Sequence, residues 1–164
     1  MQPIKVLSVA RIDDLADELP HERAHFLLFL AWDHPDMHAE KLVDLFRPLV
    51  DRSLVYFCAW GASCEAVHDA IDRCDIEKHQ EAGEELSDDT ILLTTWHARD
   101  SLAEALWFFK VCAMPARSFD PADCDRFAVA VGNPDWAAEL EREVHFIEAD
   151  ADDEIQPVLD DEDD

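Results

Sequence analysis

The sequence predicts an α/β protein, a three-layer sandwich in which a mostly parallel sheet of about five strands has helices on both faces. Short apolar runs alternate along the chain with segments of helical periodicity, which is typical of successive β-α units. Several of these runs are apolar at consecutive positions, so helices should cover both faces of those strands. The expected strands are 4–9, 26–32, 54–60, 90–96 and 126–131.

Prolines should shape the first two helices. The first, around 13–19, should be short because Pro20 cannot continue the hydrogen-bond ladder. The second should begin near Asp36, a suitable N-cap, and should present its apolar residues on one face. Pro48 lies inside this pattern, so it should kink the helix or split it.

The third and fourth helices are predicted from their caps and their apolar residues. Ser63 should cap the third helix, whose apolar residues recur with the 3.6-residue period and should face the sheet. In the fourth helix, Ser101 and Glu104 have the spacing of a capping box. The segment 102–112 is apolar almost all round, so this helix should be the most buried one.

One domain is expected over residues 1–147, because a chain of 164 residues can form a single hydrophobic core. Its fifth helix should start at Asn133 and Pro134, a cap followed by a proline at the first helical position, and should end near Ile147. The segment 148–164 carries ten acidic residues and no base, so we expect an acidic, disordered tail. Alternatively, its apolar residues dock on the body or on a partner. These residues are Ile155, Val158 and Leu159.

The charge of the chain narrows the class of its partners. A formal net charge of −26, from 39 acids and 13 bases, disfavours binding to nucleic acid and to anionic membranes. We therefore expect a basic protein or a small molecule as partner; simple adaptation of the surface to high salt is the alternative interpretation. The chain has no apolar run long enough to span a membrane, and its five cysteines have no paired CxxC spacing. These features predict a cytoplasmic protein with reduced thiols.

Three expected strands end in tryptophan, followed by polar or small residues, and the last ends in Gly132-Asn133. The carboxyl ends of parallel strands line a crevice where ligands bind, so these ends should form one shared pocket. The alternative is that the tryptophans fill the rim of the core. The residues expected to bind a ligand are Trp32, Trp60, Gly61, His68, Asp69, Thr95, Trp96 and Asn133.

A Cys-His-Asp site is the catalytic hypothesis. Cys64 falls in the first turn of a helix, where the amide groups favour the thiolate. His97 could act as its base and Asp33 could orient the imidazole, as in a hydrolase. The alternative is that Cys64 fills the core on the apolar face of its helix.

Metal and cofactor sites are not expected. Cys64 and His68 are four residues apart, a spacing that zinc ligands use, but one such pair arises easily by chance in this composition. With three glycines, the chain has no glycine-rich loop of the kind that holds nucleotide phosphates.

Two segments carry a resemblance to an uncharacterised family of small bacterial α/β proteins. They are the strand end 94–97, Thr-Thr-Trp-His, and the segment 106–109, Leu-Trp-Phe-Phe. The similarity covers about 26–114, although Val67 stands where that family is expected to have an aromatic residue. The resemblance implies an α/β fold and no known activity. It draws attention to Asp33, Cys64, His68, Asp69, Trp96 and His97.

The function expected from these observations is that of a protein-binding or inhibitory module for a basic partner, because complementary fields speed encounter and exclude anionic competitors. The alternative is a small-ligand-binding protein or a hydrolase-like enzyme that uses the strand-end crevice. Its reactive groups would be Cys64, His68 and His97.

Overall fold

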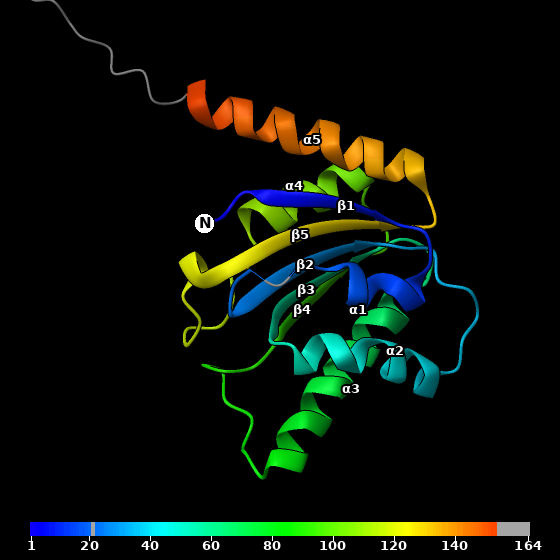
Figure 1. The fold of residues 1–164 in the computed structure, drawn as a ribbon, viewed down its shortest axis with the longest axis vertical. Coiled ribbons are helices and arrows are strands. Elements are labelled where there is room, and N and C mark those ends of the chain that lie inside the picture. The colour runs from blue at the N-terminus through cyan, green and yellow to red at the C-terminus, as the bar shows by residue number, and fades with distance from the viewer. Residues whose placement is uncertain (21, 154–164) are drawn as a thin grey trace, which may run out of the picture.

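The computed structural model describes residues 1–20 and 22–153, with side chains described as far as Phe146. Five strands form one sheet in the order β1-β5-β2-β3-β4, and every neighbouring pair is parallel (Figure 1). The strands are β1 (Ile4–Val9), β2 (His25–Ala31), β3 (Leu54–Trp60), β4 (Leu93–His97) and β5 (Cys124–Val131). The predicted α/β class and its parallel sheet are confirmed.

Helices cover both faces of the sheet, as expected for a three-layer sandwich (Figure 1). One face carries α1 (Leu15–Glu18), α2 (Ala39–Asp51) and α3 (Cys64–Ala82). The other face carries α4 (Leu102–Val111) and α5 (Pro134–Asp153). Two short 3-10 turns, Ile12–Asp14 and Pro121–Asp123, precede α1 and β5.

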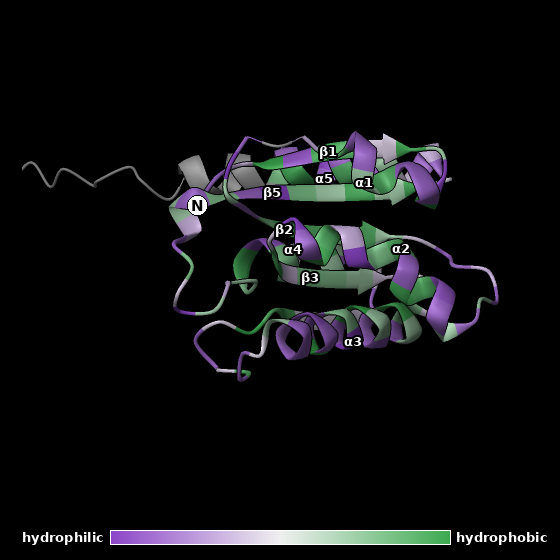
Figure 2. Cartoon of the chain, turned by 60° about the horizontal axis from the view of Figure 1, so that its bottom comes forward, coloured by the Kyte–Doolittle hydropathy of each residue, from purple (hydrophilic) through white to green (hydrophobic). Residues whose placement is uncertain are grey.

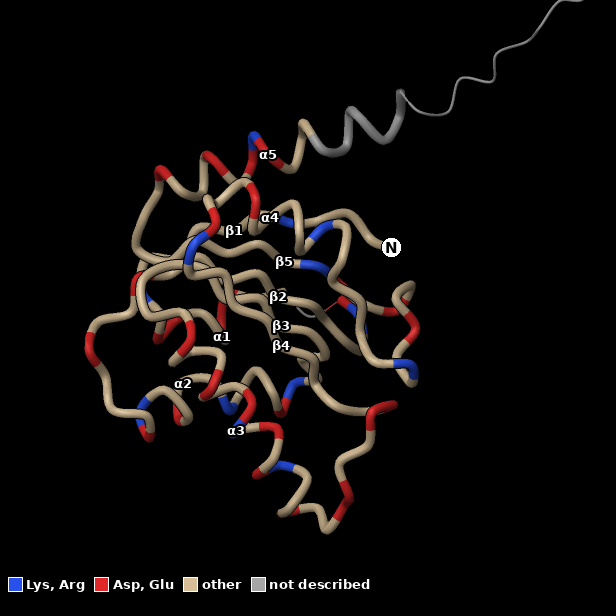
Figure 3. The backbone as a smooth tube through the Cα atoms, turned by 180° about the vertical axis from the view of Figure 1, so that it is seen from behind, with Lys and Arg blue, Asp and Glu red and all other residues tan. Residues whose placement is uncertain are grey.

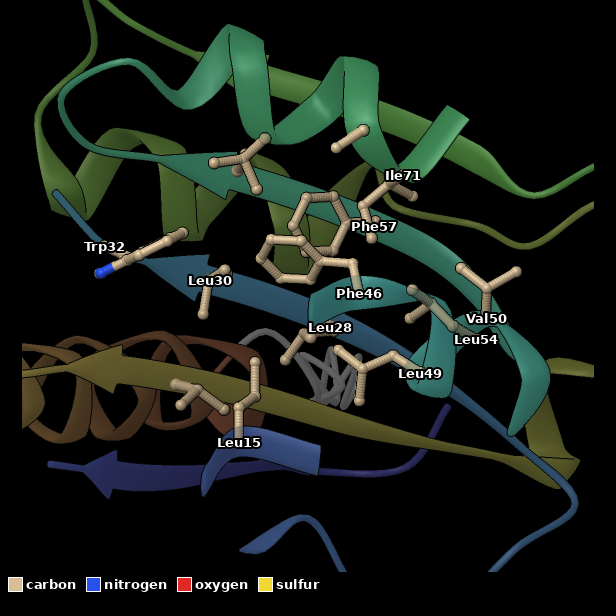
Figure 4. Close-up of a cluster of buried hydrophobic side chains, with 14 of the residues drawn as sticks. Leu15, Leu28, Leu30, Trp32, Phe46, Leu49, Val50, Leu54, Phe57 and Ile71 are labelled. Atoms are coloured by element: carbon tan, nitrogen blue, oxygen red, sulfur yellow. The ribbon is translucent and has the colours of Figure 1, made fainter. Parts of the chain in front are cut away.

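Two hydrophobic clusters hold these layers together. Between the sheet and α1 to α3, the rings of Phe46 and Phe57 lie 6.0 Å apart, and Trp32 packs against Phe46 (Figure 4). Beneath α4 and α5, Phe29 packs against Phe109 with ring centroids 5.8 Å apart. The central strands are therefore buried on both sides, which is why their sequences are apolar at consecutive positions.

The strand bounds agree with the prediction for β1 and β3 and differ elsewhere. The strand β4 begins at Leu93, three residues later than predicted, because Thr90 and Ile91 both donate backbone hydrogen bonds to Ser87 in a turn. The strand β5 begins two residues earlier, at Cys124, where it pairs with His25.

Three helix predictions require correction. The helix α2 begins at Ala39 rather than near Asp36. It continues through Pro48 to Asp51, so Pro48 does not split it. Ser63 makes no side-chain cap bond and adopts positive φ. The helix α5 continues to Asp153, past the predicted end at Ile147, and residues 154–164 lie outside the described part.

The helix α4 shows one confirmed prediction and one exposed side that the sequence did not reveal. Its capping box is present, since Ser101 Oγ accepts from Glu104 N–H and the Glu104 carboxylate accepts from Ser101 N–H. The segment is apolar almost all round, as predicted, but one side of α4 is exposed at Trp107 and Val111. The helix packs only one side against the sheet, and the apolar composition of the other side requires a different explanation.

The hydropathy of the residues differs between the sheet and the outer helix α3. In Figure 2 the strands are mainly hydrophobic, whereas α3, on the outside of the fold, is mainly hydrophilic. Within the described residues, no helix combines the length and apolarity that a membrane span requires.

Candidate functional site

The carboxyl ends of all five strands meet at one edge of the sheet, because every strand pair is parallel. There β2 and β5 are neighbours, but α2 leaves toward one face and α5 toward the other (Figure 1). Diverging connections of this kind open a crevice in which α/β proteins bind ligands. A cleft of about 380 Å³, the strand-end cleft, lies at this point. Its walls are Ala10, Arg11, Ile12 and Asp13 after β1, Trp32, Asp33, Pro35 and Met37 after β2, and, at the end of β5, its last residue Val131 with Gly132, Asn133 and Trp136 after it.

Three predicted site residues lie together in this cleft. Trp32 is nearly buried and forms a wall backed by Phe46. Asp33 is exposed, and its Oδ1 accepts a hydrogen bond of 2.7 Å from Ala62 N–H. Asn133 caps α5, since its Oδ1 accepts from Trp136 N–H at 3.2 Å. The cleft therefore combines an aromatic wall, a carboxylate and an amide, a combination suited to a small polar ligand.

The first strand also contributes to the cleft, which the sequence did not indicate. Arg11 and Asp13 line it after β1 and form an ion pair of 3.3 Å. They reach the cleft because β5 inserts between β1 and β2, so that the ends of all three strands lie side by side. Strand order is a long-range property, and no local signal in residues 10–13 reveals it.

Gly61 brings the end of β3 close to the end of β2. Its φ is +121°, and a Cβ atom there would lie 2.3 Å from the Trp32 carbonyl oxygen. A side chain at this position is excluded by both the backbone conformation and the contact. Gly61 thus has a structural role beside the cleft rather than a place in its wall.

The Cys64 thiol is buried, with 1% of the residue exposed, among the side chains between the sheet and α2 and α3. Burial raises the pKa of this thiol, and backbone amides, first that of His97, lower it by less. The expected activation by the first turn of the helix is therefore outweighed by desolvation. Cys64 has the environment of a core residue.

His97 points toward the opposite face of the sheet. Its ring packs against Phe108 of α4, with centroids 4.7 Å apart, and its Nδ1 lies 2.5 Å from Asp100 Oδ2. Its Nε2 is buried and has no hydrogen-bond partner among the described residues. The structure thus does not bring together the side chains of Cys64, His97 and Asp33 as a catalytic group.

The other predicted residues near β4 and the end of β3 make contacts within the fold. His68 packs against Trp96 at 4.4 Å, and its Nδ1 lies 3.0 Å from an oxygen of Asp69. Thr95 accepts a hydrogen bond from the Tyr56 hydroxyl at 3.3 Å. Among the described residues, no group of three or more His, Cys, Asp or Glu side chains is arranged to hold a metal ion.

Trp60 also lies apart from the cleft wall. Its ring meets Trp136 edge to face at 5.0 Å, and its indole N–H donates to the Asp100 carbonyl oxygen. Trp60 therefore packs against Trp136, which lines the cleft, but does not line the cleft itself.

A second hollow, which the sequence did not indicate, lies between α3 and β4. This α3–β4 groove has a volume of about 300 Å³. Its lining is mostly apolar, and Ile76, Leu86 and Leu93 are exposed in it. The groove is lined by Asp72, Asp75, Ile76, Leu86, Ile91, Leu92, Leu93 and Thr94.

Carboxylates surround the α3–β4 groove. Asp72 belongs to its wall, and the loop between α3 and β4 carries Glu84, Glu85, Asp88 and Asp89, all exposed. In Figure 3 acidic positions, coloured red, recur along this loop. Between residues 83 and 98 the chain contains neither Lys nor Arg. The groove is therefore an apolar surface in a negative field.

Comparison with known proteins identifies a family and no activity. No curated protein and no solved structure is significantly similar to the chain. A model of the family described as "Domain of unknown function (DUF7684)" matches residues 4–147, which extends on both sides beyond the segment 26–114 of the predicted resemblance. Because the match covers most of its length, the chain belongs to the DUF7684 family of domains of unknown function.

Proposed function

We propose that this chain is a binding module for a basic protein partner, which docks an apolar segment flanked by Lys and Arg in the α3–β4 groove. The observation that supports this proposal is the combination of exposed apolar side chains and surrounding carboxylates at one place. Apolar contact in the groove provides affinity. The negative electrostatic field of the carboxylates speeds association with a basic partner and disfavours anionic competitors.

Among the described residues, Arg73 and Lys78 of α3 form no ion pair with the carboxylates around the groove, although Asp72 lies 3.4 Å from His68 Nε2. Arg73 is engaged by Glu40 and Glu77 on the far side of the helix, and Lys78 donates to the Val50 carbonyl oxygen. The acids of the loop 84–89 are thus available to a partner.

Capture from a lysate, with the retained proteins identified by mass spectrometry, tests the proposal. The wild-type chain is expected to retain basic proteins at low salt and to release them at moderate salt, because exposed charges are screened within about 10 Å at 0.1 M. The decisive comparison uses Ile76→Asp together with Leu86→Asp. This variant removes the apolar contacts and adds negative charge, so docking in the groove predicts loss of the retained proteins.

The matched control is Phe146→Asp, which adds an acid at an exposed apolar residue of α5. It should retain the same proteins as the wild type. If the groove variant retained basic proteins more strongly than the wild type, attraction by overall charge alone would explain binding and the groove would have no part in it.

Binding of a small ligand in the strand-end cleft is a second candidate function. It is favoured by the position of the cleft between β5 and β2, where connections diverge, and by Trp32, Asp33 and Asn133 in its wall. A fragment screen that monitors the indole signals of the tryptophans by NMR tests this candidate.

The screen has a control on the same loop. Asp33→Leu removes a carboxylate of the cleft and should abolish binding of the hits. Asp36→Leu removes an exposed carboxylate that does not line the cleft and should leave binding unchanged. Equal binding to both variants would place the hits elsewhere and contradict this candidate.

A further inference from the structure

The outer side of α4 carries a stripe of large apolar side chains. Trp107 is 53% exposed, Val111 52% and Met114, just past the helix end, 45%. Trp107 and Val111 are four residues apart on α4 and therefore lie on one side of it. We call this stripe, with the exposed Cys112 beside it, the α4 face.

The segment 90–119, which contains β4 and the α4 face, lacks the strong negative charge of the rest of the chain. Between residues 90 and 119 the acids are Asp100 and Glu104, whereas the bases are Arg99, Lys110 and Arg117. Asp100 is engaged by His97, and Glu104 by the capping box. This segment thus has a formal charge of +1 in a chain of −26.

We infer that the α4 face is the surface through which two copies of this chain form a two-fold symmetric dimer. In such an interface each copy presents the same patch, so the patch must not repel itself. The α4 face meets this condition because it is apolar and its segment contains few acids. A surface such as the α3–β4 groove would instead place carboxylates against carboxylates. A basic partner has no electrostatic reason to choose the α4 face.

Salt should strengthen this dimer. The acidic remainder of each copy, including the neighbouring helix α5, repels the other copy at long range. Screening by salt removes this repulsion, while apolar contact is kept or strengthened. Dimerisation and binding of a basic partner therefore have opposite salt dependence.

Sedimentation equilibrium over a range of protein concentration and salt measures the dimer. The wild-type chain is expected to dimerise more tightly as salt increases. Trp107→Asp should raise the dissociation constant by at least about 100-fold, since a central tryptophan is lost from both copies. A chain that stays monomeric at every concentration and salt, or a Trp107→Asp variant that dimerises like the wild type, would overturn the inference.

Controls separate this inference from the proposed function. Phe146→Asp adds the same charge at another exposed apolar residue and should keep the dimer. Ile76→Asp with Leu86→Asp should also keep it, because these residues lie in the α3–β4 groove. Loss of the dimer in the groove variant alone would place the interface in the groove and contradict the α4 face.

Cysteine crosslinking provides an independent measurement. Of the five cysteines, all within the described residues, Cys112 is exposed and the other four are buried. A short bis-maleimide should therefore link the two copies through Cys112, and Trp107→Asp should abolish the linked product. Linkage of equal yield in wild type and Trp107→Asp would show random collision and count against the dimer.

Discussion

The two sides of the edge strand β4 differ in charge although both expose apolar residues. On the α3 side, exposed apolar side chains lie among Asp72 and the acids of loop 84–89. On the α4 side, Trp107 and Val111 lie in a segment whose formal charge is +1. Adaptation of a whole surface to high salt would make both sides acidic. This difference is the basis on which we propose two binding surfaces with different partners.

On each side of β4, one buried charged residue holds the neighbouring backbone in place by hydrogen bonds. On the α3 side, Asp75 is 6% exposed and its Oδ2 accepts from Leu92 N–H, which ties the segment before β4 to α3. On the α4 side, Arg126 is 5% exposed and donates to the carbonyl oxygens of Phe109 and Lys110 at the end of α4. Burial lowers the pKa of Arg126 to about 10, which shows the cost of keeping this cation inside.

The largest expected effect is that of Arg126→Ala. The variant leaves two carbonyl oxygens of α4 without a charged donor and removes a cation–π contact to Phe109, so the free energy of unfolding should fall by about 3 kcal/mol. Urea unfolding measures this change. The dissociation constant of the dimer should rise, because the α4 face loosens. Binding of basic proteins in the α3–β4 groove should not change. Arg117→Ala, at an exposed site, is the control and should leave stability unchanged within about 0.5 kcal/mol.

A smaller loss is expected from Asp75→Ala. The variant leaves the buried Leu92 N–H without an acceptor, so the free energy of unfolding should fall by about 2 kcal/mol. Retention of basic proteins should weaken as the groove wall loosens, and the dimer should persist. Asp88→Ala, in the exposed loop, provides the comparison for stability. Equal stability of the two variants would show that Asp75 does not hold the groove.

The smallest effect is expected from Ser101→Ala, which removes the cap of α4 and should cost about 1 kcal/mol. Hydrogen bonds from the Ser101 backbone and side chain lower the pKa of Glu104 below its usual 4.5, so this pKa should move back toward 4.5 in the variant.

The sign of the pH dependence follows from that shift. The pKa of Glu104 is lower in the folded state than in the unfolded state. The contribution of Glu104 to stability is therefore fully present above pH 4.5 and is lost as pH falls through the folded-state pKa. The stability difference between wild type and Ser101→Ala should therefore shrink in acid, as unfolding curves at several pH values will show. Ser63→Ala, at a position with no cap bond, should show no such trend.

Local patterns were sufficient to predict the fold class, but not the order of the strands in the sheet. The apolar runs of β2 and β3 predicted strands covered on both faces, and Ser101 with Glu104 predicted the capping box. The same patterns predicted that α4 is the most buried helix, but they did not predict that Trp107 and Val111 are exposed on it, because composition does not tell whether an apolar helix side meets the core or a partner.

The sites were predicted only in part. Trp32, Asp33 and Asn133 lie together because they follow adjacent strands, whereas Cys64 and His97 point to opposite faces of the sheet. Which strands are neighbours, and which way a side chain points after a strand ends, depend on long-range pairing that the residues themselves do not encode locally.

A binding titration tests the central claim most directly. The probe is a synthetic peptide with Leu and Lys at helical spacing, titrated at one low salt concentration into wild type and into the variant with Ile76→Asp and Leu86→Asp. Docking in the α3–β4 groove predicts weaker binding to the variant, although it is the more negative protein. Tighter binding to the variant would contradict the account, because charge alone would then determine affinity.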